Sequence, residues 1–415
     1  MHTDPLRTCR HQVRAHHRET PVAIIGAGPG GLAVAAELAR RGIAATVFER
    51  GPQVGSSWRH HYDHLRLHTA RSLSRLPGMR IPRRFGRWVA RADLVRYLED
   101  YAQRHELDVR PNTTVERVWP AERIGGERCW RLRAGGETTT ARAVVIATGL
   151  AHTPHIPDWP GLDGFSGLLL HSARYRNPDR HLGRDVLVVG GGNSGAEIAT
   201  ALAQHGATRV WWSVRTPPTI VPAAADRWQR LGVLLAKAPT SAADLLTRTF
   251  TRAQLPDLRG HGLPRPQEGL YARIRRDGSS PVHDRGIVEA VRKGRVQPVP
   301  AVASVDRSQV VLADGSRIRP DHVIAATGYR TGLARLVGPD VLATPQDLPV
   351  APELTEAPDL HFLGFTNHPA GHLHRIATEA RATAKLIARR QRQAGARTSG
   401  EPECDCAQRV SDLAG

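Results

Sequence analysis

Residues 21–50 carry the pattern that most restricts how this chain can fold. Val22–Ile25 is a short apolar run, typical of a strand that is buried on both faces. Gly26, Gly28 and Gly31 follow it as G-x-G-x-x-G, and an alanine-rich helical stretch comes next. The first glycine permits a tight turn, the second lets the backbone approach a pyrophosphate, and the third lets the helix pack on the strand. This order of elements predicts a dinucleotide-binding βαβ unit.

The second strand of this unit ends at Glu49, where a carboxylate accepts hydrogen bonds from a ribose. The helix that follows the glycines turns its free N–H groups and its positive dipole end toward the phosphates. We therefore expect FAD or NAD on this loop. The expected contacts are Gly26, Ala27, Gly28, Pro29, Gly30, Gly31, Glu49 and Arg50.

Residues 185–215 repeat the same pattern, with Gly190, Gly192 and Gly195 as the glycines. Here the second strand ends at Arg215, a cation in the place of the acid. An acid at this position repels a 2′-phosphate, whereas an arginine binds it. The first unit therefore suits FAD or NAD and the second suits NADPH. Asn193 and Ser194, at the helix start, are further candidates for cofactor contact.

Two predicted strands lead into an Ala-Thr-Gly turn, at 147–149 and again at 326–328. A strand that ends in this way next to a glycine loop indicates backbone passing close to a cofactor. The repeat predicts an α/β fold with two Rossmann-like dinucleotide-binding domains, the second inserted into the first. The expected ranges are a disordered tail at 1–19, an FAD-binding domain at 20–160 and 318–391, an NADPH-binding domain with a linker at 161–317, and a disordered tail at 392–415.

Composition excludes several other classes. The net charge is +19, but the arginines that carry it are spread along the chain without interleaved aromatics, so no nucleic acid is expected. The four cysteines form no CxxC, which argues for a cytoplasmic protein without a disulfide framework or metal site, and against a thioredoxin-reductase-like enzyme. No apolar run approaches the roughly 20 residues of an integral membrane segment. The sequence leaves open homodimerisation, and whether the helical residues 222–255 form a lid, surface helices or a membrane contact.

A third pattern lies between the two glycine units. Phe165, Gly167, His171 and Tyr175 form FxGxxxHxxxY. With this motif the chain resembles the class B flavin-dependent monooxygenases of the flavin-containing monooxygenase family, in particular the YUCCA-like branch, over nearly the whole folded part. Further stretches that carry the resemblance are Trp58-Arg59, Tyr62-Asp63, Leu67-His68, 262–266, 281–284, 326–329 and Gly364-Phe365.

The resemblance implies an NADPH- and O₂-dependent FAD enzyme that forms a C4a-(hydro)peroxyflavin. It implies oxygenation of a small lipophilic metabolite, by N- or S-oxidation or by oxidative decarboxylation of a 2-oxo acid. Alternatives are a Baeyer–Villiger monooxygenase, disfavoured by Tyr175 where those enzymes usually carry Trp, an NAD(P)H-dependent flavin reductase, and a non-catalytic flavin-binding regulatory protein.

The resemblance also implies roles for single residues. The catalytic candidates are Arg59, His171 and Asn193. Arg59 either stabilises the reduced flavin or pairs with Asp63, and His171 acts in catalysis or fixes the linker. The remaining cofactor-binding candidates are Ser57, Trp58, Gly149, Thr327, Gly328 and Tyr329.

Overall fold

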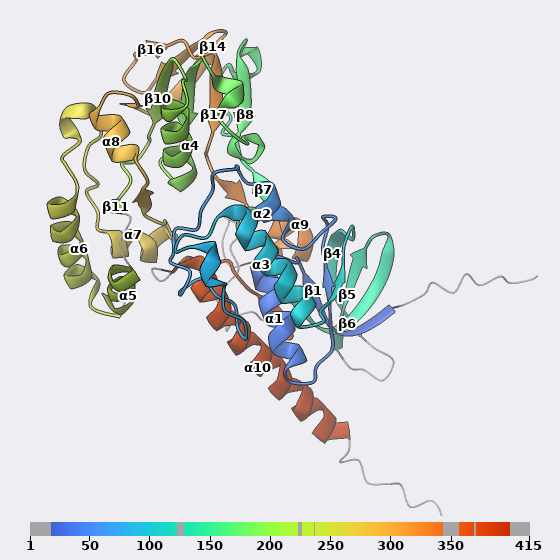
Figure 1. Cartoon of the computed structure of the whole chain (residues 1–415). Helices are drawn as coiled ribbons and strands as arrows, with labels where there is room; N and C mark the ends of the chain where they lie inside the picture. The colour runs from blue at the N-terminus through green and yellow to red at the C-terminus, as the bar shows by residue number, and fades with distance from the viewer. Residues whose placement is uncertain are drawn as a thin grey trace, which may run out of the picture.

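The computed structural model describes residues 18–122, 128–222, 226–235, 237–342, 357–368 and 371–398. Within them the chain forms two lobes, each built on a sheet with a parallel core, and a helical segment beside the second lobe (Figure 1). The predicted α/β class with two dinucleotide-binding, Rossmann-like folds is confirmed.

The first lobe is organised around β1, which pairs with β6 along its length on one side and, from Val22 to Ile25, with β2 on the other. Val22 and Ile24 enter the core on one face of the sheet, while Ala23 and Ile25 enter the core on the opposite face. The strand is apolar throughout because both of its faces are covered. The strands are, in spatial order, β3 (Asp108–Arg110), β2 (Ala45–Phe48), β1 (Arg18–Ile25), β6 (Glu137–Ile146), β5 (Arg128–Ala134) and β4 (Val115–Glu122), with β19 (Leu360–Phe362) also on β6.

Strand β6 pairs with β1 along one edge and with two different strands along the other edge. Its first half pairs antiparallel with β5, and its last three residues pair parallel with β19. The C-terminal part of the chain thus returns to complete the first sheet. The helices of this lobe are α1 (Pro29–Ala39), α2 (Ser56–Arg59), α3 (Arg91–Arg104), α9 (Leu333–Val337) and α10 (His372–Thr398), and α10 lies against α1 (Figure 1).

The second lobe repeats the plan, with β9 at the centre of an all-parallel sheet. Val186 and Val188 face one core, and Leu187 and Val189 face the other. The sheet contains β13 (Gln297–Val299), β10 (Arg209–Ser213), β9 (Asp185–Val189), β17 (His322–Ala325) and β8 (Leu168–His171), with α4 (Asn193–Gln204) and α8 (Ile287–Arg292) beside it. A separate antiparallel sheet contains β14 (Val302–Asp306), β15 (Gln309–Leu312) and β16 (Arg317–Ile318).

The expected return to the first domain at residue 318 is wrong. Strand β17 leads into the second Ala-Thr-Gly turn, but it pairs with β8 and β9 of the second sheet. Each lobe therefore has its own strand and turn of this kind. The chain crosses between the lobes at β7 (Thr153–Pro154) and β18 (Tyr329–Arg330), which pair with each other, so the return comes after β18.

Residues 220–284 form a helical cover beside the second lobe, at the left in Figure 1. The cover consists of β11 (Ile220–Pro222), α5 (Asp226–Leu235), α6 (Thr240–Gln254), α7 (Leu270–Asp277) and β12 (Val282–Asp284). The helical character expected for residues 222–255 is present in α5 and α6. Among the described residues, no helix combines the length and apolar character needed to cross a bilayer.

Both expected tails overlap regular structure. Strand β1 begins at Arg18, and α10 continues to Thr398. Residues 18–19 belong to the sheet because they continue its pairing with β6. The rest of the expected tails, 1–17 and 399–415, lies outside the described residues.

Candidate active site between the two lobes

The two glycine loops have the same geometry. Gly26 and Gly190 have φ of +105° and +135°, which L side chains rarely adopt. A Cβ on Gly31 would lie 1.9 Å from the carbonyl oxygen of Gly26, and one on Gly195 would lie 2.0 Å from that of Gly190. The third glycine of each loop is therefore required by close packing of helix on strand.

Each Ala-Thr-Gly turn closes against the first glycine of its own lobe. A Cβ on Gly26 would lie 2.7 Å from the Ala147 carbonyl oxygen, and one on Gly190 would lie 2.2 Å from that of Ala326. The repeated turn thus marks a repeated contact within each lobe. It does not mark the two ends of an inserted domain.

The middle glycine of each loop faces open space. No atom lies within 4 Å of a Cβ built on Gly28 or on Gly192, and these residues precede α1 and α4 without a side-chain cap. Next to the first loop, the Thr148 hydroxyl is buried and has no hydrogen-bond partner in the described structure. Open backbone, uncapped helix starts and an unpaired buried hydroxyl suit a pyrophosphate.

Glu49 is buried and braces the first loop. Its Oε2 accepts a hydrogen bond from the Ala27 N–H at 2.8 Å, and its Oε1 accepts one from the Gly51 N–H at 2.8 Å. Each carboxylate oxygen keeps a second lone pair for a ribose hydroxyl. The neighbouring Arg50 contacts His152 Nε2 at 3.1 Å, at the surface.

Three of the residues predicted to bind cofactor lie where the linkers cross. Thr327 donates its hydroxyl to the His155 carbonyl at 2.5 Å, and Tyr329 begins β18. The Gly328 carbonyl accepts a hydrogen bond from His171 Nε2 at 2.9 Å, and His171 Nδ1 accepts one from the Ala173 N–H. Gly149, by contrast, belongs to the turn beside the first loop, where nothing lies within 4 Å of a Cβ built on it.

His171 is a structural residue of the linker. Both of its ring nitrogens are used, and the bond to the Gly328 carbonyl requires a proton on Nε2. Burial lowers its pKa, so the neutral ring is favoured. The second of the two predicted roles, fixing the linker, is the one that this geometry supports.

Arg59 does not face the cavity described below. Its guanidinium pairs with Glu99 on α3, and its Nε donates to the Val54 carbonyl. The expected pair with Asp63 is wrong, because Asp63 is held by Arg91 and Arg176, whereas contact of Arg59 with the flavin stays a prediction. Asp63 is the acid nearest to Arg59 in the sequence, but the fold brings Glu99 from α3 to the guanidinium instead.

Arg215 lies just after β10, is exposed, and makes no ion pair within the described part of the chain.

Asn193, at the N-terminus of α4, binds β12 and the residue before that strand. Its amide donates to the Pro281 carbonyl at 2.8 Å, and its oxygen accepts from the His283 N–H at 2.9 Å. Ser194 contributes a hydrogen bond to the Tyr62 hydroxyl.

A cavity of about 480 Å³ lies where the two lobes and the cover meet. Trp58 lines it and also packs against the main cores of both lobes, whereas Ser57 beside it is exposed. None of the described lining residues is Asp, Glu, Lys or Arg. Most of the apolar wall comes from Leu67, Val221, Leu235, Leu246, Phe250, Leu270, Ile274 and Leu373, and the polar groups include His68, Asn193, Gln229, Tyr271, His283, Asn367, His368 and His372.

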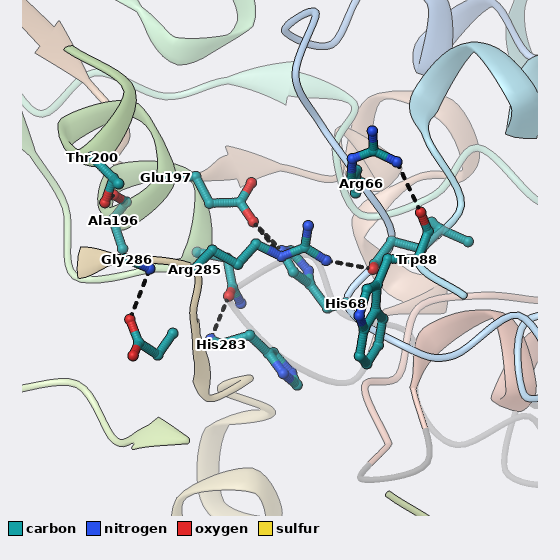
Figure 2. A network of polar contacts seen from close by, with 12 residues as sticks. Arg66, His68, Trp88, Ala196, Glu197, Thr200, His283, Arg285 and Gly286 are labelled. Atoms are coloured by element: carbon teal, nitrogen blue, oxygen red, sulfur yellow. Dashed lines mark hydrogen bonds and ion pairs between the residues drawn. The ribbon is translucent and has the colours of Figure 1, made fainter. Parts of the chain in front are cut away.

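A buried ion cluster holds the lobes together behind this cavity. Figure 2 shows Glu197, on α4, directed toward Arg285 and His68. Its Oε1 accepts from His68 Nε2 at 2.8 Å and lies 3.3 Å from Arg285 Nε, and its Oε2 accepts from the Tyr62 hydroxyl at 2.5 Å. The His68 ring stacks on His283, with centroids 5.3 Å apart and an interplanar angle of 8°.

The electrostatics of this cluster favour a charged Glu197. Burial on its own would raise the pKa of Glu197, but the hydrogen bonds from His68 and Tyr62 and the charge of Arg285 lower it below 4.5. Burial, together with His68 and Arg285, lowers the pKa of His283 to about 3, so this ring is neutral. The cluster thus has one buried carboxylate, held by donors from both lobes.

Comparison with known proteins agrees with this architecture. Residues 23–222 match the family described as pyridine nucleotide-disulphide oxidoreductase. Over 324 residues the chain is 36% identical to indole-3-pyruvate monooxygenase YUCCA1 of Oryza sativa subsp. japonica, which covers 76% of this chain and 79% of that protein. The chain belongs to the YUCCA-type flavin monooxygenases. A second YUCCA-type relative, the probable indole-3-pyruvate monooxygenase YUCCA3 of Arabidopsis thaliana, is 33% identical over 320 residues, with 75% and 73% covered.

Solved structures show the same arrangement. The flavin-containing monooxygenase from Stenotrophomonas maltophilia superimposes with a TM-score of 0.68 at 25% identity, over 90% of this chain and 99% of that one. Closed cyclohexanone monooxygenase, at 22% identity, shares the fold with a TM-score of 0.68 over 91% and 85%. As a YUCCA-type flavin monooxygenase, the chain is an enzyme whose cofactors are FAD and NADPH.

Sequence reasoning missed the ion cluster of this YUCCA-type chain. Tyr62, His68 and His283 lay in stretches that carried the resemblance, but nothing in the sequence indicated that they meet. Glu197 had a detectable signal, since it is a lone acid in the otherwise apolar and alanine-rich start of α4. An acid at such a position requires buried donors, and these come from elements far apart in the sequence.

Proposed function

We propose that this chain oxidatively decarboxylates an arylpyruvate-type 2-oxo acid with NADPH and O₂. The reaction converts ArCH₂COCOO⁻, O₂, NADPH and a proton into ArCH₂COO⁻, CO₂, NADP⁺ and water. The apolar cavity carries this proposal, because its lining includes both Trp58, which follows the first glycine unit, and Asn193, which lies in the second glycine loop. The printed names of the YUCCA relatives support the substrate class.

The chain's own residues supply binding and exclusion of water. Gly26–Gly31, Glu49, Arg50 and the turn at Gly149 would hold FAD. The loop Gly190–Gly195 would hold the NADPH pyrophosphate, and Arg215 would bind its 2′-phosphate. FAD held by the first loop would supply the chemistry that no side chain can, namely acceptance of a hydride from NADPH and activation of O₂.

The cavity wall then has two tasks. Its apolar side chains hold an aromatic ring and keep water from the reacting atoms. Its amides and imidazoles provide hydrogen bonds that orient the polar end of the substrate. Trp58 and Asn193 both line the cavity, and we assign them to substrate and cofactor positioning.

The test is a coupled assay on the purified, FAD-loaded protein. With an arylpyruvate such as indole-3-pyruvate, we expect one NADPH oxidised per CO₂ and arylacetate formed, and little hydrogen peroxide. Phenylacetate and indole-3-acetate, which lack the 2-oxo group, serve as controls that bind without reacting. NADPH oxidation that yields only peroxide with every arylpyruvate would contradict the proposal.

The uncharged cavity favours a second candidate, N- or S-oxidation of a neutral lipophilic substrate. A carboxylate substrate would have to be met by neutral donors alone, at a cost in desolvation. The same assay with an aryl methyl thioether and an arylalkyl amine distinguishes the two. Product from these compounds at higher kcat/KM than from any arylpyruvate would establish the second candidate.

Arg215→Ala tests the assignment of the second loop. We expect KM for NADPH to rise about 10- to 100-fold, since a charge-assisted phosphate contact is worth about 1.5–3 kcal/mol. KM for NADH should change less than about twofold, because NADH has no 2′-phosphate. Steady-state kinetics with both nucleotides gives the answer, with the similarly exposed Arg209→Ala, at the other end of β10, as the matched control. Equal effects on both nucleotides would remove the assignment.

A further inference from the structure

Loop 67–70 is the place where the first lobe, the second lobe and the cover meet. Its backbone groups are bound by side chains from outside the first lobe. Arg285 Nη2 donates to the Leu67 carbonyl at 2.7 Å, and Gln229 Nε2 donates to the His68 carbonyl at 2.8 Å. The Ala70 N–H donates to Gln229 Oε1, also at 2.8 Å. The His68 carbonyl and the Ala70 N–H of this loop thus both bind the side-chain amide of Gln229 from the cover.

Gln229 uses both the nitrogen and the oxygen of its side-chain amide in this contact. It lies on α5, is half-buried and lines the cavity. An amide is suited to this position because it donates to a carbonyl and accepts from an N–H at once. The loop end is fixed as well, because the His68 side chain is bound to Glu197. The contact therefore joins the cover to a loop that is itself bound to the second lobe through Glu197.

The cover is tied internally, so that its helices form one unit. The Tyr271 hydroxyl on α7 donates to the Gly232 carbonyl on α5 at 2.9 Å. Asp244 on α6 accepts from the backbone N–H of Tyr271 at 2.7 Å. A second tie to the first lobe is the Asn367 amide, which donates to the Gly278 carbonyl after α7 at 2.7 Å. Gln229 and Asn367 thus tie α5 and the end of α7 to the first lobe by hydrogen bonds, in addition to the stack of His68 on His283.

We propose that Gln229 is a positioning residue for oxygenation, whose amide holds the cover shut on loop 67–70. The inference rests on the proposed function in one respect, that the cavity is the substrate site. With the cover shut, the apolar wall excludes water from the reacting atoms. With the cover loose, NADPH, O₂ and a proton yield NADP⁺ and hydrogen peroxide, and no oxygen reaches the substrate. Gln229 thereby determines the fraction of NADPH oxidation that is coupled to oxygenation of the substrate.

The first measurement is hydrogen exchange of the full-length protein without substrate or NADPH. In Gln229→Ala, backbone amides of α5 should exchange about tenfold faster than in the parent protein, because two hydrogen bonds to the cover are lost. Gln254→Ala is the matched control, since Gln254 is exposed at the end of α6 and does not line the cavity. Its exchange should equal that of the parent.

The second measurement is the ratio of hydrogen peroxide to NADPH oxidised, with a substrate that the parent enzyme turns over. It should rise severalfold in Gln229→Ala and further in the double variant with Asn367→Ala, and stay unchanged in Gln254→Ala. Gln229→Glu keeps the size of the side chain but cannot donate to the His68 carbonyl, and should give an intermediate ratio. This variant tests the proposal even where Gln229→Ala does not fold.

The outcomes separate the two proposals. Faster exchange of α5 in Gln229→Ala, together with no oxidation of any arylpyruvate, would contradict the proposed substrate class. It would still support the proposal that Gln229 holds the cover on loop 67–70. Unchanged exchange in Gln229→Ala, or an unchanged peroxide ratio during turnover, overturns the role of Gln229 whatever the substrate is.

Discussion

Gly28→Ala protein is expected to purify folded but with a reduced FAD content, whereas Gly192→Ala protein is expected to purify with its full FAD content and to bind NADPH more weakly. Nothing lies within 4 Å of a Cβ at either position, and both residues have φ values that alanine adopts, −80° and −91°. The apo fold should therefore tolerate either methyl group. What the methyl group meets is the bound pyrophosphate, since these are the points where backbone and cofactor approach.

The size of the effect follows from overpacking. A methyl group forced into a filled site costs about 1–3 kcal/mol, which corresponds to a loss of affinity of about 5- to 150-fold. FAD content from the flavin absorbance should fall in Gly28→Ala alone. The KM for NADPH, or the dissociation constant for NADP⁺, should rise in Gly192→Ala alone. Melting temperatures of the FAD-free proteins should stay close to that of the parent.

Gly31→Ala provides the contrast within the same loop. Its methyl group would lie 1.9 Å from the Gly26 carbonyl oxygen, so the loop itself must distort. This variant should lose stability as well as FAD, and Gly195→Ala should behave likewise in the second lobe. If Gly28→Ala kept a full equivalent of FAD, or if Gly192→Ala lost it, the assignment of the two loops would be wrong.

The sequence predicted most of what depends on local pattern. The two βαβ units were visible because each needs three glycines at fixed spacing, and the close contacts at Gly31 and Gly195 show why. The contrast between Glu49 and Arg215 assigned a cofactor to each loop, and this assignment remains a prediction. Such features lie within about thirty residues of one another, so a single sequence contains them whole.

What the sequence could not predict depends on contacts between distant segments. The strand before the second Ala-Thr-Gly turn, β17, was assigned to the first domain, because the motif does not indicate which of the two sheets the strand joins. Arg59 was placed at the flavin or on Asp63, but folding brings Glu99 to it from α3. The His68 side chain meets Glu197 across 129 positions of chain, and its backbone carbonyl meets Gln229 across 161 positions. A backbone carbonyl is common to every residue type, so the sequence holds no signal for the second contact.

Glu197→Gln is expected to weaken the joint between the lobes more than any other single change of charge. Glu197 has 5% of its side chain exposed, and its removal leaves Arg285, which is 23% exposed, without its carboxylate. Breaking a buried pair costs about 3–5 kcal/mol, and partial access of water to Arg285 reduces this to about 2–3 kcal/mol. Denaturant unfolding should show the loss, and Glu289→Gln, at an exposed pair on α8, should change stability by less than about 0.5 kcal/mol.

The same substitution should change the acid side of the stability profile. Because the folded protein holds the pKa of Glu197 below 4.5, its contribution is complete above that pH and is lost as the pH falls through the folded pKa. The parent protein should therefore lose stability more steeply than Glu197→Gln below about pH 4.5. Parallel profiles for the two proteins in that range would show that Glu197 is not the ionised centre of the interface.

The catalytic consequence separates a positioning role from a merely structural one. If NADPH binds at the start of α4 and FAD beside Trp58, as proposed, hydride transfer requires the two lobes to keep their relative placement. The cluster joins α4 to Tyr62 and His68 in the segment that follows Trp58. Anaerobic flavin reduction by saturating NADPH should slow about tenfold or more in Glu197→Gln, at a temperature where the variant is fully folded and holds its FAD. Tyr62→Phe, which removes one donor and keeps the charge, should slow it less. A Glu197→Gln protein that is destabilised but reduces its flavin at the parent's rate would confine the cluster to stability.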